Sequence, residues 1–377
     1  MSACSNVALL IKRSNSMKLN FQGIYISEAL SKNNNNLDLI RILAALLVVL
    51  GHCYKLYPAT PQKLDIMEQL IHFSYFGSFA VKIFFFVSGM LVTNSLITRR
   101  SLSSFIVSRF FRIMPGLFAV LFCTAFVLGP FITSMSKAGY LINIQTWTYF
   151  LKNIAFSHVD LLPGVFCGTQ QCYTVNGSLW TLRFEMACYV FLLLFFFLVR
   201  GNKKVLGYLC WTLIIAYFAF DYVKFKRFGD FDSQYALLAS FVFGALFAVY
   251  KDKIRLNYLF VVPLLVINFV IWSIELREIF FYITTFYVVL LFATNDLVKK
   301  IKVKYDISYG VYIWGFLIQR FIIFYYPSIN FSIYIVLSLA ITIIFGLLSF
   351  LLVEKQFIEI GKKTDKFLQA KFQKLIS

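Results

Sequence analysis

The chain has 377 residues, of which 60% are hydrophobic, 19% are aromatic and only 14% are charged. A chain of this composition cannot cover a soluble globular surface with polar side chains, which excludes an ordinary soluble protein. The net charge of +19 is typical of nucleic-acid-binding proteins, but the basic residues lie between long apolar segments, so they indicate membrane topology and no nucleic-acid partner is expected.

The apolar segments predict an all-α integral membrane protein, a polytopic bundle. About ten segments approach the roughly 20 apolar residues that a membrane-spanning helix needs. They are residues 37–56, 76–97, 115–134, 179–199, 204–220, 233–250, 257–274, 279–295, 307–326 and 331–353. We therefore expect an N-terminal cytosolic segment (1–33), one membrane domain (34–355) and a basic cytosolic tail (356–377).

The distribution of lysine and arginine predicts the orientation of these helices. The segments on one side hold most of the basic residues, at 99–112, 200–204, 251–255, 299–304 and in the tail. The other side holds far fewer: Lys55, Lys63, Lys137, Lys152, Lys224, Lys226, Arg227 and Arg277. Because basic residues gather on the cytosolic side of membrane proteins, both termini are expected in the cytosol. Residues 1–33 lack a long apolar core, so no cleavable signal peptide is expected.

The first apolar segment, NNNLDLIRILAALLVVLGHCYKL (34–56), carries residues that lipid disfavours: Asp38, Arg41 and His52. A charge at the centre of a membrane helix costs roughly 2.5–3.5 kcal/mol. Helical periodicity places Arg41 and His52 on one face, roughly 16 Å apart along the axis. A long ligand could touch both side chains. The simpler alternative is an arginine that snorkels to the interface and a histidine that makes a structural hydrogen bond.

The next segments combine small residues with a group of arginines. The stretch IFFFVSGML places Ser88 and Gly89 in the middle of a helix, where they permit close approach of another helix or of a ligand chain. In RRSLSSFIVSRFFRIMPG (99–116), Arg109 and Arg112 share one helical face and suit a phosphate. Pro115 is expected to end this cytosolic loop before the third span. Simple anchoring by positive charge is the alternative.

The longest outer loop (about 135–178) contains Cys167 and Cys172 in GVFCGTQQCYT. In an oxidising compartment they could form a structural disulfide, and two separate thiols are the alternative. A lone cysteine pair is a poor zinc signal, so no metal site is predicted.

The fourth span begins with NGSLWTLRFEMACYV (176–190), which places Glu185 in the same half of the membrane as His52. A carboxylate there could orient an imidazole that acts as a general base. A salt bridge from Glu185 to Arg183 or Lys82 is the alternative.

These phrases resemble the acyltransferase-3 family of integral-membrane acyltransferases, many of which O-acetylate bacterial surface polysaccharides. The resemblance covers about residues 33–355. It rests on Arg41 and His52 with ten residues between them, FFFVSGML, Arg109-x-x-Arg112 with RIMP, NGSLWTLRFE, ISYGVYIWGF (307–316) and VEKQF (353–357). The motifs NNNLDLIR, NGSLWTL and SYGVYIWGF are most similar to those of members that act on O-antigen or capsule.

The family resemblance implies roles for individual residues. His52 would be catalytic with Arg41 as its essential partner and Glu185 in the same site. Arg109 and Arg112 would bind acyl-CoA, and we add Ser88 and Trp180 to that set. Two residues depart from the family pattern: Gly315 stands where many members carry histidine, and Arg183 where many carry a neutral residue.

The expected function is transfer of an acetyl group from cytosolic acetyl-CoA, a substrate rather than a bound cofactor, to a sugar hydroxyl. The acceptor would be a surface polysaccharide or its undecaprenyl-linked precursor, at a bacterial inner membrane. His52 would act as a general base or become transiently acylated, and the sequence leaves both routes open. The loop aromatics would hold the sugar or form an interface belt; they are Tyr140, Trp147, Tyr149, Phe166 and Tyr173. A transporter or flippase of a lipid-linked sugar is the alternative, although no internal repeat typical of transporters is evident.

Overall fold

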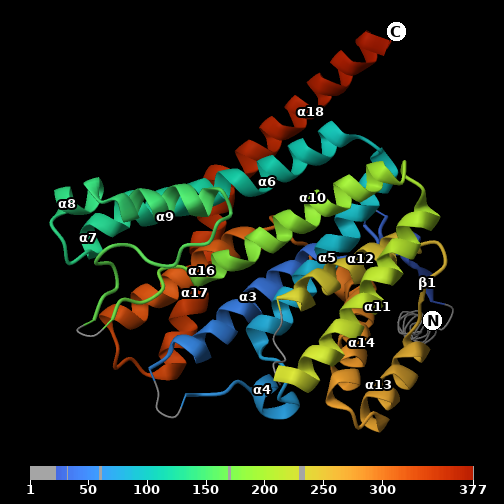
Figure 1. The fold of residues 1–377 in the computed structure, drawn as a ribbon, viewed down its shortest axis with the longest axis horizontal. Helices are drawn as coiled ribbons and strands as arrows, with labels where there is room; N and C mark the ends of the chain where they lie inside the picture. The colour runs from blue at the N-terminus through green and yellow to red at the C-terminus, as the bar shows by residue number, and fades with distance from the viewer. Residues whose placement is uncertain (1–22, 32, 59–61, 169–170, 229–233, 377) are drawn as a thin grey trace, which may run out of the picture. The chain divides into compact units, whose positions relative to one another are not determined.

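The computed structural model describes residues 23–376, except 32, 59–61, 169–170 and 229–233. The described residues are helical almost throughout (Figure 1), apart from two strands of two residues each. The chain divides into two compact units. One contains Met1–Leu37 and Tyr250–Lys302, and the other contains Asp38–Val249 and Val303–Ser377.

The smaller unit joins the chain before the first long helix to a later hairpin of apolar helices. Strand β1 (Ile24–Tyr25) pairs antiparallel with β2 (Arg255–Leu256). The side-chain amide of Asn36 donates to the carbonyls of Val298 and Ile301, at 2.8 Å each. The helices of this unit are α2 (Ile26–Ala29), η4 (Tyr258–Phe260), α13 (Val261–Val270), α14 (Ile274–Thr294) and α15 (Asp296–Lys300).

The larger unit contains the remaining helices. Its first elements are α3 (Leu37–Leu56), α4 (Ile66–Ile71), α5 (Phe76–Arg99), α6 (Leu102–Phe122), η2 (Cys123–Leu128), α7 (Gly129–Ile132), α8 (Lys137–Ile142) and α9 (Ile144–Ile154). They are followed by η3 (Gly177–Thr181), α10 (Leu182–Leu198), α11 (Lys203–Phe228), α12 (Tyr235–Val249), α16 (Ser308–Tyr325), α17 (Phe331–Ser349), η5 (Phe350–Glu354) and α18 (Lys355–Ile376).

Each apolar segment expected from the sequence contains a helix in the part of the chain that the structure describes, which confirms an all-α fold with many apolar helices. Among the residues that the structure describes, six helical runs could cross a membrane by length and composition. They are Leu37–Leu56, Phe76–Arg99, Leu102–Ile132, Gly177–Leu198, Leu276–Thr294 and Phe331–Lys371. Two further expected segments form shorter apolar helices, Tyr235–Val249 and Tyr258–Val270. The expected segments 204–220 and 307–326 correspond to α11 and α16. The orientation of the termini stays a prediction.

Helix α6 corrects the prediction that Pro115 ends a loop. The helix begins at Leu102, where Ser101 caps it, and it continues through Pro115 and a π-helical segment to Ile132. Arg109 and Arg112 therefore lie on a helix. Membrane helices tolerate proline where neighbouring groups satisfy the disturbed backbone. The carbonyl that loses its N–H partner to the proline is that of Phe111. Close by, the Tyr309 hydroxyl donates to the carbonyl of Ile113, two residues before the proline, at 2.8 Å.

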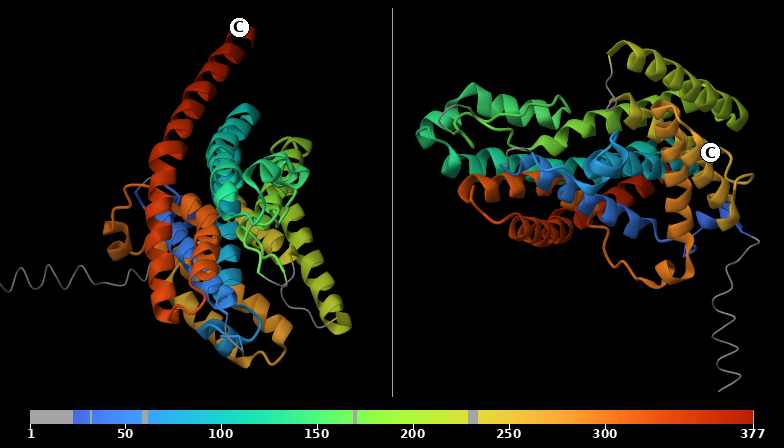
Figure 2. Two further views of the ribbon diagram at one scale, coloured as in Figure 1. Left: turned by 90° about the vertical axis from the view of Figure 1, so that its left-hand side faces the viewer. Right: turned by 90° about the horizontal axis from the view of Figure 1, so that it is seen from below.

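The predicted tail is a helix that packs on α6. Figure 2 shows α18 continuing from α17 and running beyond the neighbouring helices of its unit. Where the two helices meet, Asp365 accepts a hydrogen bond from the Ser104 hydroxyl at 2.6 Å, and Gln369 donates to the same hydroxyl at 2.7 Å. Gly361 brings the helices together, because a Cβ there would lie 2.8 Å from Cβ of Phe111. The first part of α18 is thus fixed beside the arginines of α6.

Candidate active site

The larger unit encloses a cavity of about 410 Å³ that is lined by several helices. This volume is within the range of small-molecule sites in proteins. Its walls carry an unusual number of polar and charged side chains for a membrane protein. They are Arg41, Ser88, Arg99, Ser108, Arg109, Arg112, Thr181, Glu185, Tyr189, Asp306, Ser308, Tyr309, Tyr312, Lys362 and Asp365.

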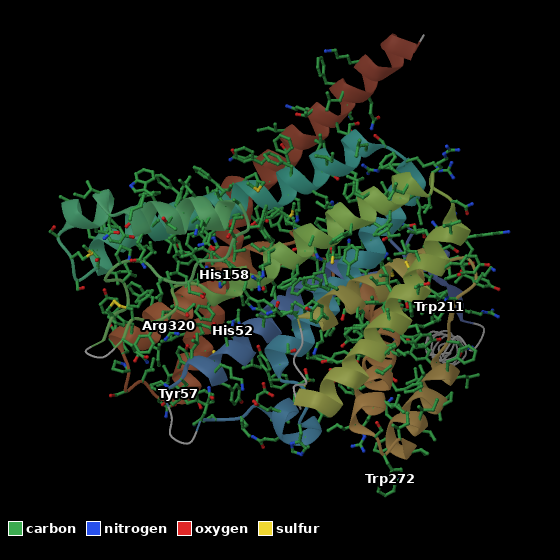
Figure 3. All side chains as sticks on the ribbon, in the orientation of Figure 1. His52, Tyr57, His158, Trp211, Trp272 and Arg320 are labelled. Carbon is green, nitrogen blue, oxygen red and sulfur yellow. A yellow bond between two sulfur atoms is a disulfide. The ribbon has the colours of Figure 1, made fainter. Side chains whose placement is uncertain are left out.

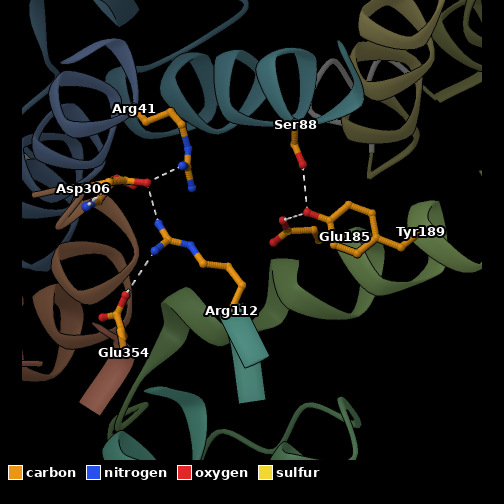
Figure 4. A network of polar contacts seen from close by, with 8 residues as sticks. Arg41, Ser88, Arg112, Glu185, Tyr189, Asp306 and Glu354 are labelled. Carbon is orange, nitrogen blue, oxygen red and sulfur yellow. Dashed lines mark hydrogen bonds and ion pairs between the residues drawn. The ribbon is translucent and has the colours of Figure 1, made fainter. Parts of the chain in front are cut away.

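Two arginines meet at one carboxylate on the wall of this cavity (Figure 4). Arg41 on α3 and Arg112 on α6 both donate to Oδ2 of Asp306, the latter at 2.5 Å. The backbone and hydroxyl of Ser308 donate to Oδ1 of Asp306, at 3.2 and 2.6 Å. Burial acts to raise the pKa of Asp306, but Arg41, Arg112 and the Ser308 hydrogen bonds together lower it below its ordinary value of 3.8. Asp306 is therefore a charged carboxylate that holds two cationic side chains together.

A second carboxylate faces Arg112 from the junction of α17 and α18. Oε2 of Glu354 lies 3.7 Å from Nη1 of Arg112, and the side chain of Glu354 is fully buried. The Ser349 hydroxyl donates to its other oxygen at 3.0 Å. Glu354 ends a π-helical segment, and such segments are frequent at functional sites. Arg112 is thus fixed from two sides.

The opposite wall of the cavity contains a chain of hydroxyl and carboxyl groups. The phenol of Tyr189 donates to Glu185, and the Ser88 hydroxyl lies 2.8 Å from the same phenol oxygen (Figure 4). The guanidinium of Arg109 lies 5.9 Å from the ring centre of Tyr189. Arg183 does not pair with Glu185: it lies over the Phe184 ring. Glu185 therefore faces Tyr189 and the cavity.

His52 lies on α3 (Figure 3), the helix that also carries Arg41. It is not among the residues that line the cavity. Its ring packs edge-on against Phe316, with ring centres 5.2 Å apart. Its Nδ1 is buried without a hydrogen-bond partner among the residues that the structure describes. Because the residue is half-buried, Nε2 is the nitrogen that can face a substrate.

Gly315 explains how α16 approaches α3 beside this histidine. A Cβ at Gly315 would lie 2.7 Å from Cγ2 of Val49, which is closer than real side chains come. The departure from the family pattern at this position therefore coincides with close helix packing. One residue on, Phe316 reaches His52.

The outer loop contributes structure and two exposed aromatic rings. Cys167 and Cys172 form a disulfide. Three of the five aromatics expected to hold a sugar are buried and unable to contact one: Tyr140, Tyr149 and Phe166. Trp147 and Tyr173 are exposed. Of the five aromatics, Trp147 and Tyr173 are therefore the ones exposed enough to contact a sugar or a membrane interface.

The structure brings most of the predicted site residues to one cavity and leaves two elsewhere. Its lining includes Arg41, Ser88, Arg109, Arg112 and Glu185. Trp180 packs edge-on against Phe184, with ring centres 5.6 Å apart, and does not line the cavity; nor does His52.

Sequence reasoning missed three residues of this site: Asp306, Glu354 and Tyr189. Asp306 directly precedes ISYGVYIWGF, and Glu354 is the acid of VEKQF. The available signal was an acidic residue at the end of an apolar segment, next to ISYGVYIWGF in one case and within VEKQF in the other. Tyr189 lies one helical turn after Glu185, which was its signal.

Several helices are apolar and long enough to cross a membrane, and a cavity between helices is lined by arginines and carboxylates. These features define a multi-pass membrane protein with an internal polar site. The family model described as "Acyltransferase domain" matches residues 34–353, and the chain belongs to this acyltransferase-3 family. It is similar to a protein of Shigella phage Sf6 named O-acetyl transferase, with 27% identity over 341 residues, 86% of this chain and 96% of that protein.

A second relative matches over a shorter region. The chain is similar to Nodulation protein 10 of Rhizobium leguminosarum bv. viciae, with 31% identity over 171 residues, 44% of each chain. No solved structure matches the chain significantly. The family and the phage relative establish an acyltransferase.

Proposed function

We propose that this acyltransferase moves an acetyl group from cytosolic acetyl-CoA to a hydroxyl of a cell-surface polysaccharide or its lipid-linked precursor, in a bacterial inner membrane. One observation carries the proposal: a single cavity gathers arginines from α3, α5 and α6, and helix α3 continues from it to an imidazole with no hydrogen-bond partner among the described residues. The similarity to a phage O-acetyl transferase supports the acetyl group and the hydroxyl acceptor.

The separation of Arg41 and His52 along α3 sets the distance between the arginines and the imidazole. Eleven residues of helix separate them, which corresponds to roughly 16 Å. The phosphates of CoA would remain beside the arginines while the pantetheine arm carries the thioester towards His52. A positioned arginine fork suits phosphate oxygens, and neutral imidazole suits proton transfer.

The chemistry at His52 has two balanced routes. As a general base, Nε2 takes the proton of the sugar hydroxyl while its oxygen attacks the thioester carbonyl; the CoA thiolate leaves and receives that proton. As a nucleophile, Nε2 attacks the carbonyl first and displaces the CoA thiolate. The sugar hydroxyl then attacks the acyl-imidazole, which releases the imidazole, and the hydroxyl proton passes to the CoA thiolate. Either route needs His52, and a general base alone contributes typically about 10²–10⁴-fold.

The test uses membranes that contain the protein, acetyl-CoA labelled in the acetyl group, and the glycan precursors of the host. We expect base-labile label in the glycan with the wild type, and a loss of about 10²–10⁴-fold in His52→Ala. His158→Ala is the matched control, because His158 pairs with Asp160 at 2.7 Å outside the cavity lining. It should retain activity.

Two results would contradict the proposal. Equal labelling by wild type and His52→Ala would remove the imidazole from the chemistry. No labelling by the wild type, with CoA release also absent, would exclude acetyl-CoA as the donor.

A further inference from the structure

The positive charge of the cavity is not spread evenly among its arginines. Arg41 and Arg112 share Asp306, and Arg112 also faces Glu354. Two acids thus balance these two bases. A phosphate that bound Arg41 or Arg112 would compete with the carboxylate of Asp306, which already accepts hydrogen bonds from both.

Three other cations line the same cavity without such a partner. Among the residues that the structure describes, Arg99, Arg109 and Lys362 line the cavity and form no ion pair. Arg109 lies deeper, over the ring of Tyr189. Arg99 and Lys362 are exposed, at the end of α5 and near the start of α18. The cations without an ion pair are therefore one deeper side chain, Arg109, and two exposed side chains, Arg99 and Lys362.

Lys362 is fixed on the cavity side of α18 by the contacts of its own helix. Gly361 packs against Phe111, and Asp365 is hydrogen-bonded to Ser104 on α6. These contacts orient the face of α18 that carries Lys362 towards Arg109 and its neighbours. Asp365 also accepts from Gln369 at 3.2 Å and makes no ion pair with Lys362. The acid one turn away therefore does not cancel the charge of the lysine.

We propose that Arg99 and Lys362 form a second phosphate subsite, which takes the 3′-phosphate on the ribose of CoA, while Arg109 takes the diphosphate. The inference rests on the proposed donor. CoA carries two separate anionic groups, a diphosphate and a terminal ribose monophosphate. The cavity offers cations without an ion pair both deeper in, at Arg109, and at exposed positions, Arg99 and Lys362. A guanidinium fork and an ammonium suit a phosphate dianion. The Arg41–Asp306–Arg112 cluster then positions helices α3 and α6 beside the bound nucleotide.

The test compares acetyl-CoA with acetyl-3′-dephospho-CoA as donors in the labelling assay. The wild type should prefer acetyl-CoA in kcat/KM by about 10- to 100-fold, as expected for a charged hydrogen-bond pair. Lys362→Ala and Arg99→Ala should lose most of that preference through KM, with little effect on the dephospho donor. Lys363→Ala and Arg100→Ala are the matched controls, since these neighbours do not line the cavity. They should leave the preference unchanged.

Binding of CoA and 3′-dephospho-CoA to the detergent-purified protein separates this inference from the proposed function. Tighter binding of CoA that Lys362→Ala abolishes would support the subsite even if no glycan were labelled. Equal binding of both compounds by the wild type would overturn it. A preference that survives in both Lys362→Ala and Arg99→Ala, or that falls equally in the control variants, would also overturn it.

Discussion

Asp306 is the single side chain on which the arginine cluster depends. It accepts hydrogen bonds from Arg41 and Arg112, and the three side chains are 15%, 25% and 16% exposed respectively. Two guanidinium groups at this proximity repel each other strongly when little water screens them. The carboxylate offsets that repulsion and so fixes α3 to α6.

We therefore expect Asp306→Ala to destabilise the protein by about 3–5 kcal/mol, the usual effect of removing one partner from a buried ion pair. The apparent unfolding temperature of the detergent-purified variant would measure this loss. Asp296→Ala is the control, since Asp296 pairs with Lys299 at 2.8 Å but is 82% exposed. Exposed pairs contribute little, so its unfolding temperature should match the wild type. An equal effect of both changes would contradict the prediction.

Acid provides a second readout for the same variant. The pKa of Asp306 lies below its ordinary value of 3.8, so the folded state favours the charged form. The stabilisation is fully present above the unfolded pKa and is lost as the pH falls through the lower, folded pKa. As the pH falls below the ordinary carboxyl pKa of 3.8, the wild type should therefore approach the stability of Asp306→Ala. A constant difference across this range would show that charge is not the cause.

At the scale of helices, α5 and α12 are held by direct backbone contact. A Cβ at Gly89 would lie 2.1 Å from the carbonyl oxygen of Phe241, and one at Gly244 would lie 2.0 Å from that of Phe86. Small residues permit such approach in membrane proteins, where dispersion rather than the hydrophobic effect joins helices. The sequence had allowed two uses for Ser88 and Gly89. Gly89 packs against α12, and Ser88 faces the cavity.

Gly244→Ala should push α12 away from α5 and destabilise the protein by about 1–3 kcal/mol, as overpacking typically does. The apparent unfolding temperature in detergent measures the effect. Gly168→Ala is the control, because the nearest atom to a Cβ there is 3.8 Å away. An unchanged unfolding temperature for Gly244→Ala would show that the two helices separate at little cost.

At the scale of the whole molecule, the predicted topology places the cavity mouth and the disulfide loop on opposite sides of the membrane. The basic segments favour cytosolic termini, while the 135–178 loop is poor in lysine and arginine. An acyl-CoA donor is cytosolic and a surface glycan is finished outside, so transfer across this topology would connect the two compartments.

We expect a fluorescent protein fused to the C-terminus to fluoresce in the cytosol. Alkaline phosphatase inserted in the disulfide loop should be active, because this enzyme folds only outside. The reverse fusions should be inactive. An active phosphatase at the C-terminus would overturn the orientation and would place Lys362 on the wrong side for cytosolic CoA.

The sequence by itself determined the membrane class, the helical segments and the shared face of Arg109 and Arg112. These features depend on local hydropathy and helical period, which a single segment contains. It did not predict that a helix continues through Pro115, because a proline locally favours the end of a helix, whereas the contacts that hold α6 come from distant residues, such as Tyr309, 196 residues from Ile113.

Only the tertiary structure decided which charges meet. Asp306 is 265 residues from Arg41 and 194 from Arg112. Glu354 is distant as well, and no local pattern specifies either pairing. The structure also showed that His52 does not line the cavity, although Arg41, which shares its helix and was predicted to share its helical face, does. The physical reason is that the hydropathy of one segment determines whether it forms a membrane helix. The packing of side chains between helices determines which residues of different helices come into contact.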